Sequence, residues 1–123
     1  MTKTDFKILI VEDDPFLSKV LGATLKNEGL EVDLAHDGEA ALDFIGKNNY
    51  KVILLDLVMP VKNGFDVLAE LKKKKNKTPV LVFTNLSQEE DKREVMNLGA
   101  KGFYVKSNIA ISEIIKVVRE FTK

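Results

Sequence analysis

Five short apolar runs, each followed by a segment with helical spacing, constrain the fold of this chain more than any other feature. The clearest run is 52–55, where four aliphatic residues stand together without polar alternation, as is typical of a strand buried on both faces. Strands that alternate with helices predict a parallel sheet covered by helices on both sides and joined by right-handed crossovers. We expect the strands at 6–11, 31–34, 52–55, 79–84 and 102–105.

The second run gives the strand order. It alternates apolar Val32 and Leu34 with charged Glu31 and Asp33, which is typical of an edge strand with one wet face. The short fifth run is the candidate for the other edge. We therefore predict an α/β fold with a doubly wound, five-stranded parallel sheet in the order 2-1-3-4-5, a flavodoxin-like arrangement.

Short polar side chains mark where the helices begin. Asp14 and Asp37 stand before helical apolar patterns and are expected as N-caps of the first two helices, and the third helix is expected to begin near Asn63. Ser87 and Glu90 have the spacing of a capping box for the fourth helix. That helix is charged almost throughout, so we expect it to be the least firmly anchored.

A run of lysines ends the third helix. Lys72 to Lys75 are consecutive, and Lys77 follows closely. Cations at a helix C-terminus oppose the negative end of the helix dipole, so we interpret the run as a solvated helix end. A docking patch is the alternative interpretation.

Composition limits the function classes. The chain has 123 residues, 19 basic and 19 acidic side chains, and no cysteine. Its size fits a single domain over residues 1–123, and the balanced charge gives no general attraction to nucleic acid or anionic membranes. Thiolate metal sites and thiol catalysis are excluded. No apolar run approaches the ~20 residues that span a bilayer, and the polar start lacks a signal region, so we expect a cytoplasmic protein.

Chemically active side chains stand at the ends of four expected strands. Glu12 and Asp13 follow the first, Asp56 the third, Thr84 the fourth and Lys106 the fifth. All parallel strands end at one edge of the sheet, and the first, third and fourth are expected neighbours, so these groups should converge. Three adjacent carboxylates raise each other's proton affinity unless cations neutralise them. One lysine and one Mg²⁺, which prefers oxygen ligands, would supply the three positive charges.

This constellation resembles the receiver domain of two-component response regulators. The resemblance covers essentially the whole chain: an acidic pair after strand one, Asp after strand three, Ser or Thr after strand four and Lys after strand five. It implies a phosphorylation-dependent signalling switch rather than an enzyme that turns over a substrate. The expected partners are a histidine kinase or phosphotransfer protein, a downstream protein target and a second copy of the chain in a phosphorylation-dependent homodimer. No direct nucleic-acid or membrane partner is expected.

The resemblance also implies a role for each site residue. Asp56 would be the phosphoacceptor, and Lys106 would pair with it and then with the phosphoryl oxygens. The hydroxyl of Thr84 would contact the phosphoryl group, and Phe103 matches the aromatic switch position. The expected magnesium ligands are Asp13, Asp56 and the backbone carbonyl of Val58, with Glu12 acting mostly through water. The surface of the fourth helix, fifth strand and fifth helix would then change. A fixed core aromatic is the alternative for Phe103.

Three departures from the family pattern have expected consequences. Ser107 stands where the family often has Pro, which disfavours a cis peptide after Lys106. Asn85 replaces a small residue and narrows access to the phosphoryl group. Val58 and Leu86, two positions beyond Asp56 and Thr84, are apolar and cannot orient an attacking water, so we predict slow autodephosphorylation.

Other functions fit the residues less well. A flavin carrier of the same topology would need a phosphate-binding loop where Glu12 and Asp13 stand, and a haloacid-dehalogenase-type phosphatase would need an Asp at Val58. A receiver-like domain used only as a protein-binding scaffold is a third alternative. His36, the single histidine, is expected in a surface loop away from the acids. The chain is expected to be either a stand-alone receiver or a part of a longer regulator.

Overall fold

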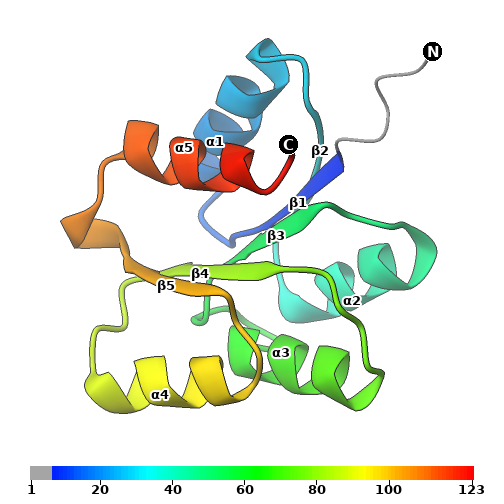
Figure 1. Ribbon diagram of the computed structural model, residues 1–123, viewed down its shortest axis with the longest axis vertical. Coiled ribbons are helices and arrows are strands. Elements are labelled where there is room, and N and C mark those ends of the chain that lie inside the picture. The colour runs from blue at the N-terminus through cyan, green and yellow to red at the C-terminus, as the bar shows by residue number, and fades with distance from the viewer. Residues whose placement is uncertain (1–6) are drawn as a thin grey trace.

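The computed structural model describes residues 7–123, which form a central sheet with helices on both faces (Figure 1). The expected strand residue Phe6 lies outside the described residues. None of the helices within residues 7–123 is long and apolar enough to cross a membrane. The elements are β1 (Lys7–Val11), α1 (Pro15–Asn27), β2 (Glu31–Ala35), α2 (Gly38–Lys47), β3 (Val52–Leu55), α3 (Gly64–Lys73), β4 (Val80–Thr84), α4 (Glu89–Asn97), β5 (Gly102–Val105), the 3-10 helix η1 (Lys106–Asn108) and α5 (Ile111–Glu120).

The sheet has the predicted topology. Its order is β2-β1-β3-β4-β5, and every neighbouring pair is parallel. The whole of β3 is buried, whereas β2 has an exposed first residue and two half-buried positions. The continuous apolar run therefore forms the central strand β3, and the alternating run forms the edge strand β2. This is expected, because a central strand is buried on both faces and an edge strand can have one face in water.

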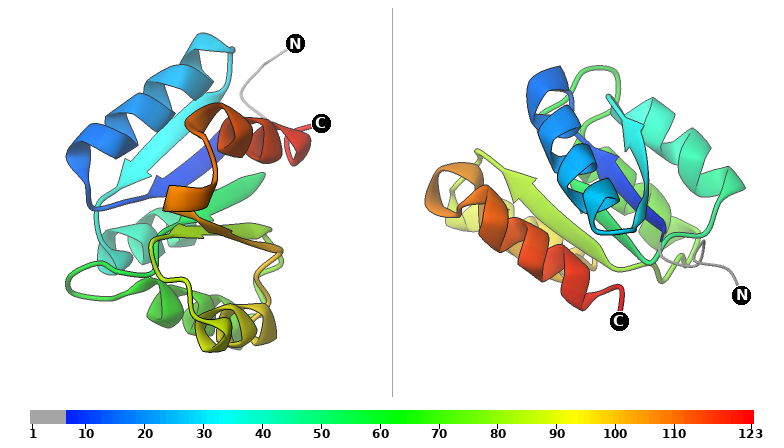
Figure 2. Two further views of the ribbon diagram at one scale, coloured as in Figure 1. Left: turned by 90° about the vertical axis from the view of Figure 1, so that its left-hand side faces the viewer. Right: turned by 90° about the horizontal axis from the view of Figure 1, so that it is seen from above.

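Two helical layers enclose two cores. Figures 1 and 2 show α1 and α5 on one face of the sheet and α2, α3 and α4 on the other. Alternate side chains of the strands divide between the layers: Leu9 and Ile53 lie in the core beneath α2–α4, whereas Ile8 and Val52 pack against α1 and α5. This division follows from the two-residue period of a strand.

The predicted caps of the first two helices are confirmed, and the third helix begins beside Asn63 as expected. The Asp14 carboxylate accepts hydrogen bonds from the backbone N–H groups of Phe16 and Leu17, and that of Asp37 accepts one from Ala40. Asn63 forms a reciprocal capping box with residue 66 at the start of α3. Each side chain satisfies N–H groups that have no partner inside the helix.

The predicted capping box of α4 is wrong by one residue. The N-cap is Gln88 rather than Ser87, and the Asp91 carboxylate, not Glu90, accepts the hydrogen bond from the Gln88 N–H at 3.3 Å. Glu89, Glu90 and Asp91 are all acidic residues in the first turn, so spacing alone could not distinguish the two frames. The expectation of weak anchoring is borne out, because Val95 is the one buried residue of the helix.

Candidate functional site

Three acids meet at the carboxyl edge of the sheet. Glu12 and Asp13 directly follow β1, and Asp56 directly follows the neighbouring β3. Oxygens of the three carboxylates lie within 4.8 Å of one another, with Glu12 and Asp56 buried and Asp13 exposed. The structure thus brings these acids together, as expected from strand order and the ends of the apolar runs.

Lys106 connects two of the acids. Its Nζ lies 2.8 Å from Glu12 Oε1 and 2.9 Å from Asp56 Oδ2, and the amine lies 5.8 Å from the centre of the Phe83 ring. The pairing with Asp56 was expected from the family resemblance. The direct pairing with Glu12 was not, because we expected Glu12 to act mostly through water. The ammonium of Lys106, which directly follows β5, therefore connects the ends of β1 and β3.

Burial and pairing act in opposite directions on these charges. Burial raises the pKa of Glu12, and the hydrogen bond from Lys106 offsets only part of that effect. Burial alone would lower the pKa of Lys106, but hydrogen bonds to Glu12 and Asp56 reverse the effect and raise it above its usual value. Lys106 therefore remains an ammonium across the physiological range.

The carboxylate of Asp56 is held in one orientation. Its Oδ1 accepts hydrogen bonds from the backbone N–H groups of Leu57 at 2.7 Å and Val58 at 3.3 Å, while Oδ2 faces Lys106. The other buried acid is also fixed, since Glu12 Oε2 accepts a hydrogen bond from the Asp14 N–H at 3.1 Å. Fixed polar groups need little reorganisation when charge changes nearby.

Two glycines that were not among the predicted site residues shape the loop after Asp56. Gly64 begins α3 so close to the Asp56 backbone that any Cβ there would clash with it, and its N–H donates to the Leu57 carbonyl. Gly38, the first residue of α2, makes an equally close approach to the Lys62 carbonyl. Val61, in the loop between β3 and α3, has a φ of 67°, which is a costly conformation for a β-branched residue. The signal available in the sequence was a glycine directly after the predicted N-cap Asp37, and another directly after Asn63, near which the third helix was expected to begin.

The expected switch residues lie on β4 and β5. Thr84 ends β4 with its side chain buried, and its hydroxyl accepts a 3.4 Å hydrogen bond from the Leu86 N–H. Phe103 is half-buried against the core beneath α2–α4, whereas Tyr104 packs in the opposite core, as expected from strand alternation. Phe103 thus shares a core with the buried Val95 of α4.

The residues that depart from the family pattern differ in exposure. Val58 is 55% exposed, Leu86 is half-buried and Asn85 is exposed. No cis peptide bond occurs among residues 7–123, so the bond after Lys106 is trans. His36 is exposed, as expected, and its Nδ1 lies 3.1 Å from the backbone carbonyl oxygen of Glu12.

The donor set fits a hard divalent cation. Three carboxylates and one ammonium leave a formal charge of −2, and all the acidic ligands are oxygens. The exposed side chain of Asp13 leaves one side of the cluster open to water, which Mg²⁺ retains in most protein sites.

Comparison with known proteins identifies the family. A family model described as the response regulator receiver domain matches residues 8–119. The chain belongs to this family. Receiver domains are the phosphorylatable switches of two-component systems, so the flavin-carrier and phosphatase alternatives are set aside.

Solved receiver domains have the same fold. The receiver domain of Francisella response regulator 1452 is 31% identical, with a TM-score of 0.88 over 94% of this chain and 95% of that one. Vibrio cholerae chemotaxis protein CheY4 is 30% identical, with a TM-score of 0.85 over 94% and 98%. Thermotoga maritima TrrA, solved in complex with Mg²⁺ and BeF, is 30% identical, with a TM-score of 0.81 over 94% and 98%.

Curated relatives of this receiver domain are transcriptional regulatory proteins. Escherichia coli CpxR is 41% identical over 81% of this chain and 42% of its own length. Bacillus subtilis YkoG, an uncharacterised transcriptional regulatory protein, is 35% identical over 91% of this chain and 49% of its own length. The chain thus spans about half the length of these relatives.

Proposed function

We propose that Asp56 accepts a phosphoryl group from a phosphohistidine of a histidine kinase or phosphotransfer protein. An Asp56 oxygen attacks phosphorus, the phosphorus–nitrogen bond breaks, and the imidazole leaves with the electron pair and takes up a proton. The observation that carries this proposal is the convergence of three acids within 4.8 Å beside one bridging ammonium. Such transfer depends mainly on positioning and charge neutralisation.

The other site residues have supporting roles in this proposal. Asp13, Asp56 and the Val58 carbonyl would hold Mg²⁺, with Glu12 beside it, and the bound ion would neutralise charge on the phosphoryl oxygens. The complex of TrrA with Mg²⁺ and BeF supports this assignment. Lys106 exchanges its contact with Asp56 Oδ2 for one with a phosphoryl oxygen, and Thr84 donates its hydroxyl to another.

The phosphoryl group changes the docking surface in this scheme. It adds roughly −1.5 to −2 charges and three acceptor oxygens. The Thr84 hydroxyl turns toward it, Phe103 rotates into the space released, and the surface formed by α4, β5 and α5 changes. That surface is where a downstream target or a second copy would dock. The sparse anchoring of α4, with Val95 its one buried residue, supports it as the moving part.

The chain assists this transfer and its own slow dephosphorylation without acting as an enzyme on a separate substrate. The apolar side chains of Val58 and Leu86 support a long-lived phosphate, since neither can position water for attack. We further propose that residues 1–123 form a single receiver domain in the cytoplasm, which the family match over residues 8–119 supports.

Labelling from acetyl phosphate tests the proposal. In the presence of Mg²⁺ we expect the intact protein to gain the mass of one phosphoryl group, and we expect no gain after addition of EDTA. Asp56→Asn should abolish labelling. Asp14→Asn is the matched control, because that residue is a nearby acid that caps α1 and lies outside the cluster. Full labelling of Asp56→Asn would overturn the assignment, and loss of label within seconds would contradict the slow dephosphorylation.

A further inference from the structure

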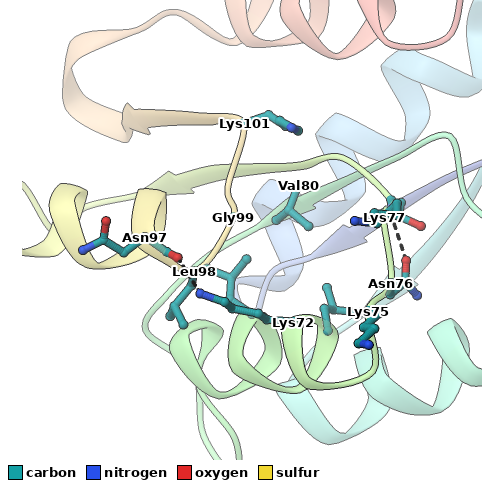
Figure 3. Close-up of a pocket in the computed structure, with 12 residues that line it drawn as sticks. Lys72, Lys75, Asn76, Lys77, Val80, Asn97, Leu98, Gly99 and Lys101 are labelled. Carbon is teal, nitrogen blue, oxygen red and sulfur yellow. Dashed lines mark hydrogen bonds between the residues drawn. The ribbon is translucent and has the colours of Figure 1, made fainter.

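A pocket lies at the end of the sheet opposite the acids. It is bounded by the last turn of α3, the loop before β4 and the loop between α4 and β5, and has a volume of about 370 Å³ (Figure 3). Val80, which begins β4, lies in its lining, whereas Thr84 at the far end of that strand belongs to the candidate site. The pocket thus stays accessible when a partner covers the acidic edge.

The pocket has a large excess of positive charge. Lys72, Lys75, Lys77 and Lys101 line it, and no Asp or Glu does. Within residues 7–123 none of these four lysines forms an ion pair. The C-terminal ends of α3 and α4 offset only about half a charge each. The two helix dipoles therefore compensate about one of the four charges that line the pocket, which leaves most of the positive charge available to an anionic partner.

The lining is not only charged. Leu68, Leu71, Val80 and Leu98 also contribute to it. Apolar surface beneath lysines suits an apolar side chain flanked by carboxylates better than a nucleic-acid backbone, which would need a longer positive track. The net charge of zero over the chain also gives no long-range attraction to nucleic acid.

We propose that this pocket is a docking site for an acidic segment of a partner protein, in which carboxylates flank one apolar side chain. The carboxylates pair with Lys75, Lys77 and Lys101, and the apolar side chain rests on the leucines beneath. Charge complementarity is the basis of the choice, since the four lysines that would face a partner are exposed and have no acidic residue among them.

Lys72 gives the site a connection to α4. Its Nζ donates a 3.0 Å hydrogen bond to the carbonyl of Asn97, the last residue of α4, as Figure 3 shows. The last turn of α4 contains no basic residue of its own, so this bond caps the helix from α3. An acidic segment that draws Lys72 away loosens α4, and a change in α4 in turn alters the affinity for the segment.

A peptide titration of the intact chain tests the site. The probe is a short acetylated and amidated peptide in which glutamates flank one leucine, added at low ionic strength with EDTA present. We expect amide resonances of Asn76, Asn97 and Gly99 to shift, while those of Asp13 and Asn85 stay unchanged. The double variant Lys75→Gln, Lys77→Gln should weaken binding about 2- to 30-fold, since an exposed ion pair contributes about 0.2–1 kcal/mol.

Matched controls separate this site from general charge effects. Lys19→Gln with Lys26→Gln removes the same charge from exposed positions on α1 and should leave the affinity unchanged. A peptide with serine in place of the leucine should bind more weakly. Absence of shifts around Gly99, equal loss of affinity in the α1 control, or shifts there with a DNA duplex but not with the peptide would each overturn the proposal.

Discussion

α5 and α4 flank the same edge strand, β5, yet they are held very differently. α5 buries three branched aliphatic side chains, Ile114, Ile115 and Val118, in the core that it shares with α1. α4 buries one, Val95, and exposes nearly all its other side chains. Burial of a large aliphatic side chain contributes about 1.5–3 kcal/mol, so α5 has several times the anchoring of α4. The difference identifies α4 as the element that a local event can displace.

The acidic edge of the sheet is firmly held, like α5 and unlike α4. Glu12, Asp56 and Thr84 are all buried, and each has at least one hydrogen bond to its side chain. The molecule therefore combines a fixed chemical site with a weakly held neighbouring helix. That combination suits the proposed switch, which needs strict geometry where the charge would change and a low cost of displacement where the molecule would respond.

The largest expected effect tests the anchoring of α5. Ile114→Ala removes a fully buried side chain and should lower the free energy of unfolding by about 2–5 kcal/mol. Met96→Ala on α4 is the control, because that side chain is 42% exposed and its truncation should change stability by about 0.5 kcal/mol or less. Urea unfolding monitored by circular dichroism measures both. Equal losses would remove the contrast between the helices.

The next effect concerns the connection between the acids and β5. Lys106→Met leaves Glu12 and Asp56 buried without their ammonium, and should cost about 1.5–3 kcal/mol in the absence of metal. Added Mg²⁺ should reduce that loss, because the ion supplies positive charge at the same place. Lys101→Met, at the exposed other end of β5, should change stability by about 0.5 kcal/mol or less. A loss independent of Mg²⁺ would argue against a metal site there.

The sequence predicted the sheet and the gathering of acids because both follow from local patterns. A run such as 52–55 has to be buried on both faces, and parallel strands end at a common edge, so the positions of Glu12, Asp13 and Asp56 were determined by strand order. The N-caps of α1 and α2 were equally predictable, since each is a single short polar residue before a helical pattern.

What escaped prediction depends on distances between segments that no local pattern encodes. The contact between Lys106 and Glu12 depends on how a long side chain that follows β5 reaches past the ends of β4 and β3 to that of β1. The approach of Gly38 to Lys62 depends on the packing of α2 against a distant loop. The prediction of the α4 cap was wrong for a different reason. Three consecutive acids in the first turn allow more than one residue pair with capping-box spacing.

A smaller effect separates stability from switching. Thr84→Val keeps the side-chain shape and removes a hydroxyl whose hydrogen bond to the Leu86 N–H is long, at 3.4 Å, so stability should change by about 1 kcal/mol or less. The shifts that beryllofluoride and Mg²⁺ induce in the amide resonances of α4 should nevertheless disappear, because no hydroxyl is left to turn inward. Thr84→Ser should restore them. Persistent α4 shifts in Thr84→Val would show that the helix responds by another route.

The smallest effect is a pH dependence at the fixed edge, measured in EDTA. Burial raises the pKa of Glu12 above its usual 4.5, so the folded protein holds this proton more tightly than the unfolded chain does. The contribution of Glu12 to stability is therefore fully present below pH 4.5 and is lost as pH rises through the raised pKa.

The Glu12→Gln variant cannot titrate at this position, so comparison with the wild type isolates the pH-dependent contribution of Glu12 to stability. The free energy of unfolding of the wild type, minus that of Glu12→Gln, should fall as pH increases from 4.5. Lys106 adds no slope in this window, because its own raised pKa lies above 10.5. If the difference rises with pH instead, pairing with Lys106 outweighs burial. In that case charge pairing would hold the acidic edge of the sheet together. The acidic edge and α4 would then differ in the type of interaction that holds them as well as in its strength.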